Sequence, residues 1–167
     1  MPGAAMEIFV IRHAIAAPAQ KGEEDAERAL TDEGRERFAR AVRGLHRLGT
    51  TFERVLYSPA KRAVQTGKLL EPLTYGSLEP SPLLSKEPSP ELLKKLARHA
   101  SEGPMALVGH EPWLGQLMAW LVFEAKDRGQ AFDLKKGGVA WLEGEPRPGK
   151  MRVRALFTPR VLRAVRR

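Results

Sequence analysis

Short apolar runs alternate with segments of helical spacing along this chain, and this alternation is the strongest constraint on its fold. The runs at 6–12, 54–57 and 105–108 have the length and composition of buried strands. Between them, apolar residues recur every three or four positions, for example from Phe38 to Leu48. Strands that alternate with helices form mostly parallel sheets with helices on both faces. We therefore expect an α/β fold, a three-layer α/β/α sandwich.

Helix start and stop signals bound the predicted helices. Thr31 is a good N-cap, and Gly49 ends the apolar repeat that follows it. A second helix is expected over 60–70, and Ser89 caps a third that begins with Pro90. A fourth follows the strand at 105–108, with its apolar stripe at Leu114, Leu117, Met118, Leu121 and Val122.

The remaining segments predict the edges of the sheet. Residues 15–29 lack a clean period and read as a loop, and one weak edge strand is expected near 77–79. Residues 139–143 and 151–157 alternate like strands and are joined by a Pro/Gly turn, so they predict an antiparallel strand near the C-terminus. The length fits a single domain over residues 1–167.

Two histidines follow predicted strands. Arg12 is the last residue of the first predicted strand, and His13 comes directly after it. In the same way, His110 follows the strand at 105–108 and Ser58 follows the strand at 54–57. In parallel sheets, ligands bind beyond the C-terminal strand ends, so these four side chains are expected to converge. A neutral imidazole attacks phosphorus well near neutral pH, which makes His13 a candidate nucleophile.

The arginines suit the same chemistry. A guanidinium stays charged and matches the oxygens of a phosphoryl group, which favours Arg12 and Arg62 as its ligands. Arg62 falls in the first turn of a predicted helix, where an anion is also stabilised by free amides. His110 can add a donor to a phosphoryl oxygen. His46 and His99 read as structural or exposed.

Composition excludes several classes of site. The absence of cysteine rules out disulfides, thiolate metal sites and cysteine nucleophiles. His13 and His110 lack further ligands at metal-binding spacing, so we expect neither a metal nor a cofactor. The longest apolar stretch, 117–123, is too short to cross a bilayer, so no membrane association is expected. The lack of cysteine and of a secretory signal favours the cytoplasm.

The net charge of +8 indicates an anionic partner. Part of the excess lies in residues 150–167, which hold seven arginines and lysines and no acid. Because no nucleic-acid-binding module is recognisable, we favour a phosphorylated partner over a nucleic acid.

Four sequence blocks resemble the histidine phosphatase superfamily and occur in its order. They are Arg12-His13-Ala14, Leu30-Thr31-Asp32-Glu33-Gly34, Ser58-Pro59 with Arg62-Ala63-Val64-Gln65-Thr66, and Val108-Gly109-His110-Glu111-Pro112. In its short length, the chain resembles the small SixA-type phosphohistidine phosphatases. The resemblance implies a phosphoglycerate mutase-like fold, a phosphorylated His13, and Arg12, Arg62 and His110 around the phosphate. It places Arg28 at the edge of the pocket, and Ser58 is a further candidate for substrate binding.

The chain departs from the family pattern after His13. Ala14 replaces the commoner glycine, and residues 15–18 replace the polar side chains of relatives that act on phosphate esters. We therefore expect fewer phosphate contacts from this loop and less mutase-like activity, which favours phosphohistidine over an ester as the substrate.

Three functions are weighed. The first is hydrolysis of phosphohistidine, in a phosphorylated protein or a small phosphoramidate, through phospho-His13. The second is a small-molecule ester phosphatase, which needs an acid for its leaving group; Glu79, Glu87 and Glu91 are candidates, with Glu87 favoured by position. The third is a non-catalytic basic domain that binds phosphate or nucleic acid.

Overall fold

The computed structural model describes residues 3–166, which build one six-stranded sheet in the order β3-β2-β4-β1-β5-β6. The strands are β1 (Met6–Arg12), β2 (Phe52–Tyr57), β3 (Thr74–Pro80), β4 (Met105–Gly109), β5 (Val139–Gly144) and β6 (Met151–Phe157). The α-helices are α1 (Asp32–Arg47), α2 (Lys61–Lys68), α3 (Pro90–Arg98), α4 (Trp113–Phe123) and α5 (Pro159–Ala164). Short 3₁₀ turns are η1 (Asp25–Glu27), η2 (Glu71–Leu73), η3 (Pro82–Ser85) and η4 (Lys126–Phe132).

The sheet is mostly parallel. Strand β1 pairs in parallel with β4, which pairs in parallel with β2, and β2 pairs in parallel with β3. Strand β5 runs antiparallel to both of its neighbours, β1 and β6. The expected antiparallel strand near the C-terminus is therefore confirmed, and it is β5.

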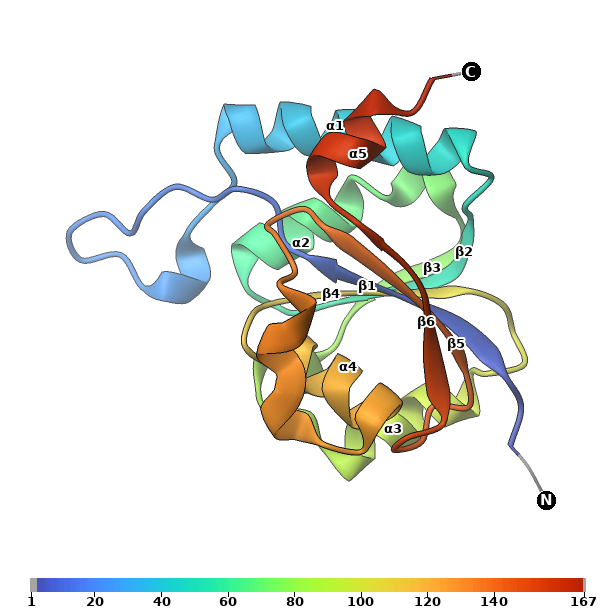
Figure 1. Cartoon of the computed structure of the whole chain (residues 1–167). Helices are drawn as coiled ribbons and strands as arrows, with labels where there is room; N and C mark the ends of the chain where they lie inside the picture. The colour runs from blue at the N-terminus through green and yellow to red at the C-terminus, as the bar shows by residue number, and fades with distance from the viewer. Residues whose placement is uncertain (1–2, 167) are drawn as a thin grey trace.

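Helices cover both faces of the sheet, as Figure 1 shows. The core on one face joins Ile8 and Leu107 to buried leucines of α3 and α4. The core on the other face joins Phe9 and Val108 to α1, α2 and α5. Alternate residues of one strand enter opposite cores because successive side chains point to opposite faces. This is the predicted three-layer sandwich.

The predicted helix ends are confirmed by their caps. The Thr31 hydroxyl accepts from the Gly34 amide at 2.9 Å, and the Ser89 hydroxyl accepts from the Leu92 amide at 3.3 Å. Gly49 follows α1 in the left-handed region at φ 78°, a conformation that costs glycine little.

Two elements differ from the sequence-based expectation. The weak edge strand extends over Thr74–Pro80, because parallel pairing with β2 supplies hydrogen bonds that its local composition does not signal. Helix α5 was not predicted. It is held by one buried side chain, Leu162, and its backbone approaches α1 so closely that a Cβ on Gly44 would lie 2.0 Å from the Leu162 carbonyl oxygen.

The parallel strands β1, β2 and β4 end at the same edge of the sheet. Their last residues bring Arg12, His13, Ser58 and His110 to that edge, as the strand-end argument expected. The segment between β1 and α1 projects from this edge in Figure 1. None of the helices formed by residues 3–166 is both long and apolar enough to cross a bilayer.

Candidate active site

The backbone at the end of β1 is held on both sides. The His13 amide donates to the Gly109 carbonyl at 3.0 Å, and the Ala14 amide donates to the Thr66 hydroxyl at 3.0 Å. Ala14 does not adopt a positive φ, so alanine takes the place of the family's commoner glycine without backbone strain. These contacts fix the position from which the His13 side chain extends.

The His13 ring has a defined tautomer. Its Nδ1 lies 2.7 Å from the Ala14 carbonyl oxygen, which can only accept, so Nδ1 carries the proton. The second nitrogen, Nε2, is left with a lone pair. The ring is 6% exposed. Burial first, and then the positive charges of Arg62 and Arg12, lower the pKa of His13 from 6.5 to about 3. His13 is therefore neutral at neutral pH, the form that a nucleophile requires.

His110 lies beside His13, with their ring centroids 5.2 Å apart. The His110 Nε2 lies 2.8 Å from the Ser58 hydroxyl, which in turn lies 2.9 Å from the Ser85 hydroxyl. When Ser58 donates to Nε2, the ring proton of His110 resides on Nδ1 and is available to an anion. Burial first, and then the positive charge of Arg62, lower the pKa of His110 to about 4.

Arg12 is anchored by the loop before β5. Its Nη1 donates to the Leu134 carbonyl at 3.0 Å. The Gly137 amide donates to the carbonyl oxygens of both Arg12 and His13, at 3.0 and 3.1 Å. The loop between η4 and β5 thus holds the strand end that carries the proposed nucleophile.

Arg62 lies in the first turn of α2 and is 8% exposed. Its Nη2 donates to Asp25 Oδ2 at 2.9 Å, and its Nη1 donates to the Asp25 carbonyl at 2.8 Å. The other carboxylate oxygen of Asp25 accepts from Arg28 Nη1 at 2.9 Å. The hydrogen bonds that the Asp25 carboxylate accepts from Arg28 and from Arg62, that of Arg28 first, lower the pKa of Asp25. Asp25 is therefore a carboxylate at neutral pH.

Three buried nitrogens at this edge have no hydrogen-bond partner among residues 3–166. They are Arg12 Nε, Arg62 Nε and His110 Nδ1. Leaving a buried donor without a hydrogen-bond partner costs about 1–3 kcal/mol of folding free energy, so such donors often mark a site where a ligand binds. Phosphoryl oxygens are acceptors that all three suit.

A cavity of about 490 Å³ opens beside these groups. Ser58, Arg62, Ser85 and His110 line it together with two carboxylate residues, Asp25 and Glu111. Burial raises the pKa of Glu111, whose Oε1 is buried without a hydrogen-bond partner among the residues described. The cavity therefore joins one buried arginine, Arg62, to one carboxyl whose protonated form is favoured by burial.

The structure brings together most, but not all, of the predicted site residues. Arg12, His13, Arg62, His110 and Ser58 meet at the sheet edge, and Arg28 reaches it only through Asp25. Glu87 lies outside the cavity lining: its side chain is 66% exposed and lies 3.6 Å from Lys126 Nζ. The structure therefore gives no support to Glu87 as the proton donor.

Sequence reasoning missed Asp25, Ser85 and Glu111. Asp25 and Ser85 come from loops with no periodic pattern, so no local signal marks them. Glu111 directly follows His110, and that position is a signal that identifies it. Within residues 3–166, no three His, Asp or Glu side chains gather closely enough to hold a metal ion.

Comparison with known proteins bears on the family and the fold of the chain. Residues 8–84 match the histidine phosphatase superfamily (branch 1). An uncharacterized protein of Picosynechococcus sp. is 34% identical over 157 residues, covering 90% of each chain.

Solved structures share the fold. The protein histidine phosphatase SixA complexed with tungstate has a TM-score of 0.75 at 23% identity, covering 94% of this chain and 99% of that one. The alpha-ribazole phosphatase of Shigella flexneri has a TM-score of 0.69 at 16% identity, covering 92% and 97%. The family is shown by the match of residues 8–84 and by the ordered motifs: the chain belongs to the histidine phosphatase superfamily.

Proposed function

We propose that this protein hydrolyses phosphohistidine, in a phosphorylated protein or as a small phosphoramidate, through a covalent phospho-His13 intermediate. The observation that carries the proposal is the state of His13: buried, neutral, with Nδ1–H fixed on the Ala14 carbonyl and the Nε2 lone pair left for attack. Arg12 and Arg62 supply positive charge around it, and these two residues and His110 supply N–H donors. The likeness to SixA solved with tungstate, a tetrahedral oxyanion, supports the same chemistry.

The proposed cycle has two displacements at phosphorus. His13 Nε2 attacks, the P–N bond of the substrate breaks, and the substrate imidazole leaves with the bonding electron pair. When the other ring nitrogen of the substrate is protonated, the phosphorylated ring is a cation. It then leaves as neutral imidazole without a general acid. Water then attacks phospho-His13, the new P–N bond breaks, and phosphate and neutral His13 are released. The two arginines and His110 stabilise charge on the equatorial oxygens in both steps.

Covalent labelling tests this proposal. Rapid quenching with ³²P-labelled phosphohistidine peptide should trap an acid-labile, alkali-stable label, and His13→Ala should abolish both label and turnover. His110→Ala and Arg62→Ala should lower kcat by about 10²–10³, the usual cost of losing a donor to the transition state. His46→Ala is the matched control, because that histidine is exposed on α1. Turnover that survives His13→Ala would overturn the proposal.

A second candidate, hydrolysis of a small phosphate ester, is favoured by Glu111. An alkoxide leaving group needs a proton, and burial raises the pKa of this cavity-lining carboxyl. Glu111→Gln should then lower ester turnover at least tenfold and spare the phosphohistidine peptide, with Glu87→Gln as the matched control. Equal rates in Glu111→Gln and wild type would eliminate Glu111 as the acid.

A further inference from the structure

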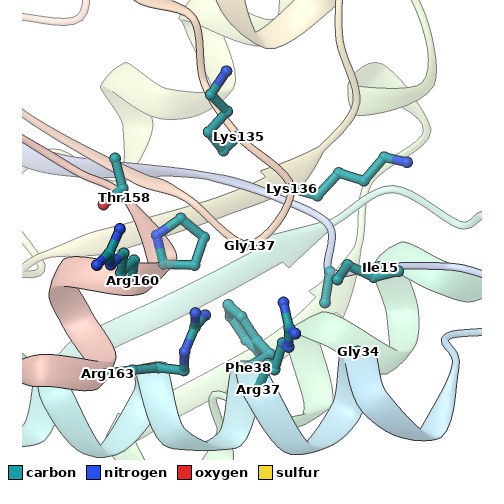
Figure 2. Close-up of a pocket in the computed structure, with 12 residues that line it drawn as sticks. Ile15, Gly34, Arg37, Phe38, Lys135, Lys136, Gly137, Thr158, Arg160 and Arg163 are labelled. Atoms are coloured by element: carbon teal, nitrogen blue, oxygen red, sulfur yellow. The ribbon is translucent and has the colours of Figure 1, made fainter.

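A second concave site lies on the other side of the segment that follows His13. This basic pocket, of about 330 Å³, is formed by the start of α1, the loop before β5 and the start of α5 (Figure 2). Its cations are Arg37, Lys135, Lys136, Arg160 and Arg163. No acidic residue is among those that line it.

Three of the five cations have no acidic partner within residues 3–166. Arg37 pairs with Glu33 at 2.6 Å, and Lys135 pairs with Asp133 at 2.9 Å. No carboxylate of residues 3–166 lies within 4.0 Å of the charged groups of the other three, Lys136, Arg160 and Arg163. Three uncompensated positive charges around a hollow repel one another, and an anion in the hollow relieves that repulsion.

The wall and floor of the basic pocket are apolar. Phe38, Ile15 and Gly137 line it (Figure 2), and Pro159 is a further lining residue. The ligand that fits is therefore an anion on a short aliphatic stem, as in a glutamate or aspartate side chain. Methylene groups would cover Phe38 and Pro159 while the carboxylates meet the cations.

The basic pocket shares structure with the catalytic edge. Ala14 and Ile15, which line it, directly follow His13. Gly137, another lining residue, donates its amide to the Arg12 and His13 carbonyls. A group bound here thus sits beside the chain segment that carries the nucleophile, where the body of a phosphorylated protein would lie.

We propose that the basic pocket binds acidic side chains of the phosphohistidine-bearing protein, close to the phosphorylated residue. This assignment rests on the proposed function for its substrate, but the pocket itself is a separate site. It selects acidic protein substrates by lowering KM, while kcat is set at His13.

A pair of peptides tests the proposal. One phosphohistidine peptide carries flanking glutamates, and the other carries glutamines at the same positions. Wild-type protein should show a KM about tenfold lower for the glutamate peptide, from three partly exposed charge pairs. The triple variant Lys136→Gln, Arg160→Gln, Arg163→Gln should lose that preference and keep kcat and its KM for phosphoramidate.

The matched control removes the same charges elsewhere. This control is the triple variant Lys94→Gln, Arg98→Gln, Arg152→Gln. Its three side chains lie on α3 and β6, and all are exposed. It should keep the tenfold preference. Loss of the glutamate preference in this control would overturn the proposal, and so would retention of the preference in the pocket variant. Either result would show that the net positive charge of the protein, and not the basic pocket, causes the preference.

A binding measurement separates this inference from the proposed function. Titration calorimetry with the unphosphorylated peptides at low salt should detect tighter binding of the glutamate peptide, absent in the pocket variant. This result stands even if phosphohistidine is not hydrolysed. Equal binding of both peptides sinks the pocket assignment. The pocket variant could also lose the binding of a single-stranded oligonucleotide that wild type binds as tightly as the glutamate peptide. That result would overturn the assignment to acidic proteins, because the pocket would then bind polyanions in general.

Discussion

The Asp25 carboxylate accepts a hydrogen bond from Arg62 at 2.9 Å, at the edge of the catalytic cavity. A carboxylate thus occupies donors that a phosphoryl group requires. Asp25→Asn should tighten binding of inorganic phosphate about threefold, because an exposed repulsive charge is removed. Titration calorimetry measures this, with Asp127→Asn, an exposed acid on η4, as control. Weaker binding would instead indicate that Asp25 holds the guanidinium in place.

Thr66 links α2 to the strand end that carries His13. Its hydroxyl accepts from the Ala14 amide at 3.0 Å and donates to the Arg62 carbonyl at 2.7 Å, and the side chain is fully buried. Thr66→Val should cost about 1–3 kcal/mol of unfolding free energy, because the buried Ala14 amide loses its acceptor. Urea unfolding measures the change, and Thr66→Ser, which keeps the hydroxyl, should restore most of it. Equal stability of the two variants would refute the hydrogen-bond account.

Gly34 allows α1 to approach the segment after His13. A Cβ there would lie 2.2 Å from the Ile15 carbonyl oxygen. Helix propensity alone predicts that Gly34→Ala stabilises by about 1 kcal/mol, whereas the steric clash predicts a net loss of about 1–3 kcal/mol. Thermal or urea unfolding decides between the two signs. A stabilised variant would show that the contact relaxes without cost.

The two buried histidines predict acid sensitivity. Their pKa values fall to about 3 for His13 and about 4 for His110, so between pH 6.5 and these values the unfolded chain binds more protons. The contribution of the two neutral histidines to the free energy of unfolding is therefore complete above pH 6.5 and is lost as the pH falls below that value. Each histidine should account for about 2 kcal/mol between pH 7 and pH 5.

Urea unfolding from pH 5 to pH 7 checks this sensitivity. The pH dependence should be shallower in His13→Asn and His110→Asn, and His46→Asn, on the exposed face of α1, is the control. An unchanged slope in both active-site variants would show that other groups cause the acid sensitivity.

The sequence by itself determined the layer architecture and the strand ends. Apolar periodicity and local caps such as Thr31 and Ser89 are properties of neighbouring residues, so the main helices and most strands followed from them. His13 and His110 were identified because parallel strands end at one edge. Glu87 was favoured by its place in the chain, and the structure puts it on the surface beside Lys126.

Only the tertiary structure decided what surrounds the two histidines. Asp25 reaches Arg62 across 37 positions of sequence, and Ser58 meets Ser85 across 27. The cations of the basic pocket come from three separate segments. Contacts of this kind depend on how loops return over the sheet edge, and no local periodicity encodes that path. Burial, which sets the pKa values of His13, His110 and Glu111, likewise exists only once the layers have packed.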